Sequence, residues 1–159
     1  MSSSALRFLE CLAILGLSVF FVLGIAAQDA GAAEPPISHE VSDTDLEWGS
    51  CPNFFPPGCQ IAVLHGDPSL PNVDVFFRVP GNYDLPAHRH TSAERMVLVA
   101  GELEVTYDGQ PALSLKPGTY AYGPASLPHS GRCVSSEPCV LFIAFEESLD
   151  ATPVAIEPK

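Results

Sequence analysis

Residues 80–105 read PGNYDLPAHRHTSAERMVLVAGELEV. Two histidines, His88 and His90, lie one residue apart in this stretch, and Glu94 follows them. Residues i and i+2 of a strand point to the same face, so the two imidazoles are expected to project together. Glu94 joins them provided that the chain continues or bends without changing phase. Two imidazoles and a carboxylate on one face suit a divalent transition metal, whereas the alternative is two exposed histidines beside a surface glutamate.

A further histidine favours the metal site. His129 lies in PGTYAYGPASLPHSG, residues 117–131, at the expected start of another strand. The intervening chain is long enough for two hairpins, and an antiparallel sheet can return His129 to the first pair. We therefore treat His88, His90, Glu94 and His129 as one candidate site.

The chain from Gln60 to Phe145 is divided into short apolar segments. These segments are rich in β-branched and aromatic residues and are separated by Gly, Pro, Asn or Asp, which is typical of strands in a sandwich or barrel. The sequence DGQ at 108–110 indicates a hairpin turn. The chain has 16 prolines, which disfavour long helices. The pattern predicts a small, mostly antiparallel all-β fold.

The first motif resembles that of the cupin superfamily. That motif has a glycine, a short spacer, His-X-His, a glutamate and a second glycine. Here Gly81 is followed by His88-Arg89-His90, Glu94 and Gly101, and only the spacer after Gly81 is one residue longer than usual.

The second cupin motif is also recognisable, with two departures. The family pattern Gly, Pro-X-Gly, His and Asn corresponds to Gly118, Pro124-Ala125-Ser126, His129 and Cys133. Ser126 replaces the turn glycine and Cys133 replaces the asparagine. Neither replaced residue is a metal ligand in the family, so the departures concern the geometry of the turn.

The resemblance implies a cupin-type jelly-roll β-barrel over residues 59–148. It also implies one divalent metal ion, which could be Fe, Mn, Ni, Cu or Zn, since all tolerate such ligands. The ligands implied are His88, His90, Glu94 and His129. Apolar walls are expected around the metal, and the candidate wall residues are Phe77, Met96, Tyr107, Tyr122 and Phe142. Arg78 and Arg95 could face the interior, although outward positions are favoured.

Two functions are compatible with this resemblance. The first is a small-molecule metalloenzyme of dioxygenase (an oxidoreductase) or isomerase type, in which Glu94 leaves the metal to act as a catalytic base. The second is a non-catalytic binding or sensing module, similar to the zinc cupin domain of anti-sigma factors. A metal-free interaction barrel is a third alternative. Many cupins dimerise edge to edge, so a homodimer is also compatible with the resemblance.

Residues 1–27 have the pattern of a secretory signal peptide. Arg7 precedes an apolar run that ends at Ala27, and small residues follow. The run is shorter than the ~20 apolar residues that cross a bilayer, although a membrane anchor is the alternative. Cleavage after Ala27, or as late as Ala32, predicts an exported protein, periplasmic or secreted, with no membrane attachment.

The remaining organisation is simple. Residues 28–58 are expected to form an irregular, Pro-rich and acidic lead-in, and residues 149–159 a C-terminal tail. The formal net charge of −12 and the absence of a Lys/Arg cluster disfavour nucleic acid as a partner. A small-molecule ligand or substrate is therefore the expected partner.

Four cysteines remain after removal of the leader. An even count in an exported protein favours disulfides, for which three pairings exist, and a four-cysteine zinc site is the alternative. The simplest pairing joins neighbours in sequence, Cys51–Cys59 and Cys133–Cys139. If the strands that flank the second pair form a hairpin, its two cysteines lie roughly opposite each other.

Overall fold

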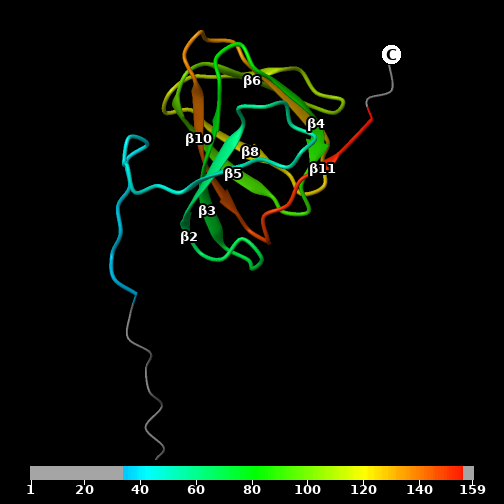
Figure 1. The fold of residues 1–159 in the computed structure, drawn as a ribbon. Helices are drawn as coiled ribbons and strands as arrows, with labels where there is room; N and C mark the ends of the chain where they lie inside the picture. The colour runs from blue at the N-terminus through cyan, green and yellow to red at the C-terminus, as the bar shows by residue number, and fades with distance from the viewer. Residues whose placement is uncertain (1–33, 156–159) are drawn as a thin grey trace, which may run out of the picture. The chain divides into compact units, whose positions relative to one another are not determined.

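The computed structural model describes residues 34–155, so the predicted signal peptide lies outside the described residues. Within this range the chain forms eleven strands and no helix. The strands build two antiparallel sheets that face each other as a barrel (Figure 1), and the predicted jelly-roll all-β fold is confirmed. No helix in this range has the length and apolar character that a membrane span requires.

The larger sheet has six strands in the order β1-β2-β3-β10-β5-β8. Their bounds are β1 Trp48–Ser50, β2 Gln60–His65, β3 Val73–Val79, β10 Cys139–Phe145, β5 Glu94–Ala100 and β8 Tyr120–Gly123. The smaller sheet has five strands in the order β11-β4-β9-β6-β7. Their bounds are β11 Thr152–Pro153, β4 Asp84–Arg89, β9 His129–Cys133, β6 Leu103–Tyr107 and β7 Leu113–Leu115.

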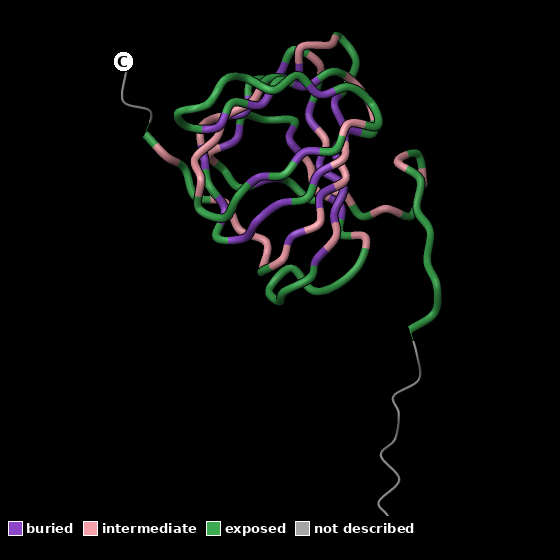
Figure 2. Tube along the Cα trace, turned by 180° about the vertical axis from the view of Figure 1, so that it is seen from behind, coloured by how far each residue is buried: buried purple, intermediate pink, exposed green. Residues whose placement is uncertain are grey.

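Alternating apolar residues build the barrel interior. In β3, Val73, Val75 and Val79 are almost completely buried, and β10 pairs with β3 along its whole length. Figure 2 shows buried segments along the strands and exposed segments mainly in the connecting loops. This pattern gives the barrel an apolar interior, in which charged and polar groups interact more strongly than in water.

Two short strands lie in segments that the sequence pattern describes as irregular. β1 belongs to the lead-in and pairs with β2, while β11 belongs to the tail and pairs with β4. Backbone groups make these pairings at the edge of a sheet, and strands of three and two residues are too short for a periodic pattern.

Both disulfides are present with the predicted pairing, Cys51–Cys59 and Cys133–Cys139. The expected hairpin around the second pair is wrong. Cys133 ends β9 in the smaller sheet and Cys139 begins β10 in the larger sheet, so this disulfide joins the two sheets. The five residues between the cysteines cross from one sheet to the other, which sequence spacing cannot distinguish from a hairpin turn.

Candidate metal centre

Two of the candidate ligands are cross-strand neighbours in the smaller sheet. His88 in β4 is paired with His129, the first residue of β9. Their ring centroids lie 4.3 Å apart. The antiparallel pairing therefore returns His129 to the first histidine pair, as the spacing of the sequence suggests.

A bulge in β4 directs His88 into the barrel. The pairing of β4 with β9 shifts register between Leu85 and His88, and both residues line the internal cavity although they are three positions apart. Pro86 lies in this irregular part and has no backbone N–H for the ladder. The bulge thus changes the alternation of the strand just before the first candidate ligand.

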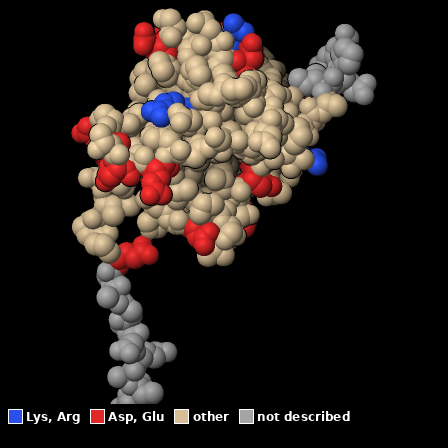
Figure 3. Space-filling model, viewed as in Figure 1, with Lys and Arg blue, Asp and Glu red and all other residues tan. Residues whose placement is uncertain are grey.

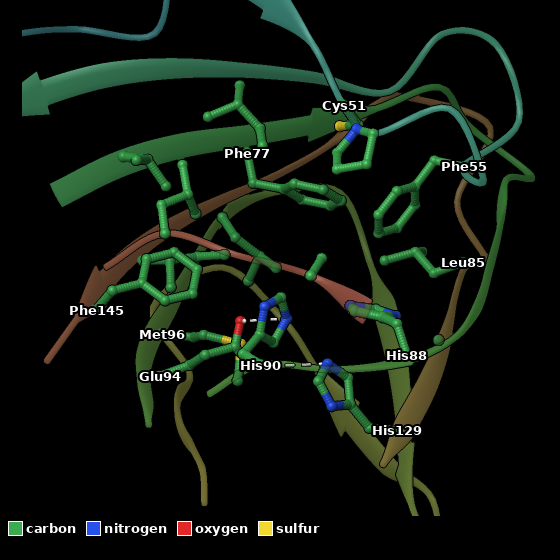
Figure 4. Close-up of a pocket in the computed structure, with 18 of the residues that line it drawn as sticks. Cys51, Phe55, Phe77, Leu85, His88, His90, Glu94, Met96, His129 and Phe145 are labelled. Atoms are coloured by element: carbon green, nitrogen blue, oxygen red, sulfur yellow. Dashed lines mark ion pairs between the residues drawn. The ribbon is translucent and has the colours of Figure 1, made fainter. Parts of the chain in front are cut away.

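Glu94 reaches the site from the opposite sheet. The chain leaves the smaller sheet after Arg89 and enters the larger sheet at Glu94, so the strand does not keep its phase across this turn. Oε1 of Glu94 lies 3.3 Å from Nε2 of His90, and Oε2 lies 3.6 Å from Nε2 of His129. Figure 4 shows the three histidines and Glu94 gathered at one end of the cavity.

Hydrogen bonds orient all three imidazoles in the same way. Nδ1 of His88 donates to the carbonyl oxygen of Pro86 at 2.7 Å, and Nδ1 of His129 donates to that of Leu127 at 3.2 Å. Nδ1 of His90 donates to the carbonyl oxygen of Asp150. A carbonyl only accepts, so each Nδ1 carries the proton in the neutral ring and each Nε2 presents a lone pair.

This arrangement fits a cation. In the group His88, His90 and His129, the potential ligand nitrogens all lie within 4.8 Å of one another. Three lone pairs and a carboxylate converge without a donor between them, which is unfavourable unless a positive charge lies among them. The donor set therefore suits one divalent transition metal ion.

Burial keeps the imidazoles of His88 and His129 neutral. It lowers the pKa of His88 to about 3, with a further contribution from the charge of His129, and lowers the pKa of His129 to about 4. Burial also raises the pKa of the Glu94 carboxyl, an effect that His90 partly opposes. His88 and His129 are thus ready to bind a metal at neutral pH, whereas a proton on Glu94 competes with the metal.

The four residues lie at one end of a cavity of about 480 Å³. Its walls are mostly apolar and include Phe77, Met96, Leu141 and Phe145. Among the residues that the structure describes, no lysine or arginine lines the cavity. A ligand here would bury apolar surface and meet most of its polar partners near the histidines.

The loop closed by Cys51–Cys59 covers part of the cavity. The Phe55 ring lies edge-on to the His88 ring at a centroid distance of 5.0 Å, and it also contacts Phe77. Figure 4 shows Cys51, Phe55 and Phe77 on the side of the cavity away from Glu94. The sequence does not indicate this role for Phe55, because nothing in the pattern relates it to His88.

Two of the five candidate wall residues line the cavity and three do not. Phe77 and Met96 line the cavity, whereas Tyr122 is exposed and Phe142 is not a wall residue. Tyr107 is buried behind His129, with ring centroids 5.2 Å apart.

Both arginines interact away from the cavity, as the sequence favoured. Arg78 lies 3.8 Å from the centroid of Trp48, and Arg95 pairs with Glu146.

A family profile described as "Cupin domain" matches residues 75–145. Residues 75–145 therefore form a cupin domain. Within this cupin, the matched region begins in β3 and ends with β10, so it contains all four candidate ligands.

Solved and curated cupins resemble this chain over part of their length. Dimethylsulfoniopropionate lyase DddQ of Ruegeria pomeroyi is 28% identical over 81 residues, which are 51% of this chain and 40% of the lyase. A crystal structure of this lyase has a TM-score of 0.55 and 25% identity, covering 69% of this chain and 60% of that one. The chain thus spans less than two thirds of the relative.

A more distant similarity concerns the fold alone. A structure of oxalate decarboxylase from Bacillus subtilis, an enzyme with Mn(II) centres, has a TM-score of 0.55 and 17% identity. The match covers 62% of this cupin and 29% of the decarboxylase.

Proposed function

We propose that this cupin is an exported metalloenzyme that acts on a small, largely apolar molecule. The proposed metal ligands are His88, His90, Glu94 and His129. One observation carries the proposal: three Nε2 atoms, each with its Nδ1 held by a carbonyl, converge with a buried carboxylate at the end of an apolar cavity. A purely structural barrel has no need of such a converging, unsatisfied donor set.

The charge of the metal-loaded site limits how much negative charge a substrate can carry. With three neutral imidazoles and one carboxylate, a divalent ion leaves the site with a net charge of about +1. The cavity walls supply no further cation among the described residues. Figure 3 shows acidic side chains distributed over the face that is drawn, in keeping with the net charge of −12. The substrate is therefore an apolar molecule with at most one negative charge, and polyanions are disfavoured.

Glu94 is the proposed catalytic base. A bound divalent ion would polarise an oxygen of the substrate and stabilise the negative charge that develops on it. Glu94 is 4% exposed and its pKa is raised, so its carboxylate becomes a stronger base once it is released from the metal. It takes a proton from the carbon next to the polarised group, while the apolar walls exclude water. This step is shared by isomerases and by dioxygenases that use an enolised substrate.

A lyase is the second candidate, favoured by the similarity to DddQ. Elimination starts with the same proton transfer. The base removes the proton next to the carboxylate, its C–H electron pair forms the new C=C bond, and the bond from the next carbon to sulfur breaks. For dimethylsulfoniopropionate the products are acrylate and dimethyl sulfide, which leaves with the C–S electron pair.

The metal centre is tested first. Protein purified from the periplasm should hold close to one transition metal ion per chain by elemental analysis. His129→Ala should lower the affinity for Zn(II) or Mn(II) sharply, whereas His65→Ala, a histidine of β2 outside the site, should not. Full occupancy in a variant that lacks both His88 and His129 would overturn the ligand set.

The reaction class is tested next on the metal-loaded protein. Candidate apolar carbonyl compounds and carboxylic acids are incubated in D₂O, and NMR follows deuterium entering the carbon next to the carbonyl. Oxygen consumption identifies a dioxygenase, and release of dimethyl sulfide identifies the lyase. A protein that binds metal but shows none of these reactions is a binding or sensing module.

Export is tested by N-terminal sequencing. The two disulfides favour an oxidising compartment, in agreement with the predicted leader. The exported chain should begin at Gln28 or, with later cleavage, at Ala33. An unprocessed N-terminus at Met1 on membrane-associated protein would instead support an anchor.

A further inference from the structure

The segment after β10 contacts the candidate metal centre from outside the cupin motifs. We call residues 147–154 the C-terminal strap. The N–H of Glu147 donates to Oγ of Ser92 at 2.9 Å, and Ser92 lies in the turn between His90 and Glu94. The strap therefore begins beside the turn that connects two of the proposed ligands.

The strap is fixed on both sides of Asp150. Before it, the N–H of Leu149 donates to the carbonyl oxygen of Pro68 at 2.9 Å. After it, β11 pairs with β4, where Thr152 is opposite Arg89 and Pro153 is opposite His88. The N–H of Val154 then donates to the carbonyl oxygen of Ala87 at 3.0 Å. These bonds hold Asp150 against the strand that carries the first ligand.

Asp150 makes two contacts with the ligand segment. Its carbonyl oxygen accepts the Nδ1–H of His90, and its Oδ1 accepts the backbone N–H of Thr91 at 2.9 Å. The other two histidines bond to carbonyls only two residues before them in the chain. His90 depends instead on a residue 60 positions away. Its orientation is therefore set by tertiary structure and not by the residues just before it in the chain.

We propose that Asp150 is a positioning residue that orients His90 for metal binding, and that the strap completes the metal centre. The proposal rests on the metal centre proposed above. The Asp150 side chain anchors its own carbonyl through Thr91, and the carbonyl in turn fixes the tautomer and plane of the imidazole. Outer partners of this kind typically contribute about 10- to 100-fold to metal affinity. Because Leu149, Asp150 and Ala151 also line the cavity, the same segment forms part of the substrate wall.

The test compares two substitutions at one position. Asp150→Ala removes the anchor to Thr91 and should weaken Zn(II) binding about 10-fold or more, measured by competition with a chromophoric chelator. Asp150→Asn keeps an oxygen acceptor and should bind nearly as tightly as the wild type. Asp84→Ala is the matched control, because within the described residues this exposed carboxylate of β4 forms an ion pair only with Arg132, at 2.5 Å. It should bind Zn(II) normally.

Two further measurements separate positioning from stability. With Co(II) at saturation, Asp150→Ala should change the visible absorption bands of the metal, whereas Asp150→Asn should not. NMR of the wild-type protein should show His90 as the Nδ1–H tautomer with a slowly exchanging proton, which needs no variant that could fail to fold.

The outcomes are distinguishable. Zn(II) affinity of Asp150→Ala within about 2-fold of the wild type, or equal losses in the Ala and Asn variants, would overturn the role of Asp150. So would an Nε2–H tautomer of His90 in the metal-free protein. Absence of Zn(II) binding by the wild type would instead refute the metal centre on which the proposal rests.

Discussion

Glu94 and His129 come from opposite sheets, and Oε2 of Glu94 lies 3.6 Å from Nε2 of His129. The protein shifts the pKa values of these two groups in opposite directions. The pKa of His129 is lowered to about 4 and that of His88 to about 3, from an ordinary value of 6.5. The pKa of Glu94 is raised from 4.5. The stability of the metal-free protein therefore depends on the difference between these effects.

We predict that the metal-free protein loses stability as the pH falls from 6.5 toward 4. In this window the unfolded chain binds protons at His88 and His129 that the folded chain does not, which lowers the free energy of unfolding by up to about 1.4 kcal/mol per pH unit for each histidine. Glu94 acts oppositely, since its raised pKa stabilises the folded state at low pH and this contribution is lost as the pH rises through that pKa. Glu94→Gln should therefore steepen the loss. Urea unfolding at several pH values checks this, and equal slopes in both proteins would contradict it.

Tyr107 supplies a second prediction. Its hydroxyl is the one buried side-chain group without a hydrogen-bond partner among the described residues. A methyl group added at Gly123 would lie 2.8 Å from this hydroxyl and 3.0 Å from Oε2 of Glu94, so both oxygens are directed toward Gly123. Burial, with a further contribution from Glu94, raises the pKa of Tyr107, so the hydroxyl stays protonated.

Tyr107→Phe removes this unsatisfied group and should raise the free energy of unfolding of the metal-free protein by about 1 kcal/mol. Tyr83→Phe is the matched comparison, because the Tyr83 hydroxyl donates to the carbonyl oxygen of Pro56 at 2.5 Å. Its removal should lower the free energy of unfolding by about 1 kcal/mol. Urea unfolding without metal measures both. A loss of stability in Tyr107→Phe would show that the hydroxyl has a partner in solution.

The convergence of the four candidate ligands could be predicted from the sequence because short motifs determine their positions. The spacing of His88, His90 and Glu94 and the distance to His129 are local or depend on simple antiparallel pairing. Their outer partners could not be predicted in this way. The bond from His90 to Asp150 uses a backbone carbonyl, and every residue has one. No residue type at position 150 therefore indicates it.

Two further features needed the three-dimensional structure for a similar reason. The contact of Phe55 with His88 depends on where a disulfide-closed loop lies over the barrel. The bulge in β4 changes which residues face inward, and neither Pro86 nor its neighbours indicate the direction of that change. Strand periodicity predicts the faces of regular strands and fails where the register shifts.

Ser126 is one of the two residues at which the chain departs from the second cupin motif. It occupies the position of the family's turn glycine and has a φ of 63°, the left-handed region that glycine adopts freely. Its N–H donates to the carbonyl oxygen of His90 at 2.8 Å, so the turn keeps its geometry without the glycine. The strain of a serine in this conformation is about 1–2 kcal/mol.

Ser126→Gly should raise the free energy of unfolding by about 0.5 kcal/mol, because relief of strain exceeds the added entropy of the unfolded chain, about 0.4–1 kcal/mol. Asn82→Gly is the control. Asn82 has a φ of 58°, but asparagine tolerates this region well, so little change is expected. Urea unfolding measures the free energy of unfolding of both variants. A destabilised Ser126→Gly would show that the serine side chain contributes more than its strain removes.

The disulfide between Cys133 and Cys139 should act on stability and not on the metal. It joins the ends of β9 and β10 in different sheets, and His129 lies at the other end of β9. Replacing both cysteines with serine should lower the free energy of unfolding by about 2–3 kcal/mol, the value for a short closed loop. Zn(II) affinity of the folded protein should change by less than about 3-fold, since none of the ligands' hydrogen bonds is removed.

The other disulfide is the matched comparison for this prediction. Cys51→Ser with Cys59→Ser opens a loop of similar length, but this loop holds Phe55 against His88 at a centroid distance of 5.0 Å. We expect a comparable loss of stability, about 2–3 kcal/mol, together with weaker Zn(II) binding. The reason is that the His88 ring loses its apolar cover and water reaches the site. Chelator competition and urea unfolding on both double variants separate the two effects. Weaker binding in the Cys133/Cys139 variant alone would show that β9 needs its cross-sheet link to present His129.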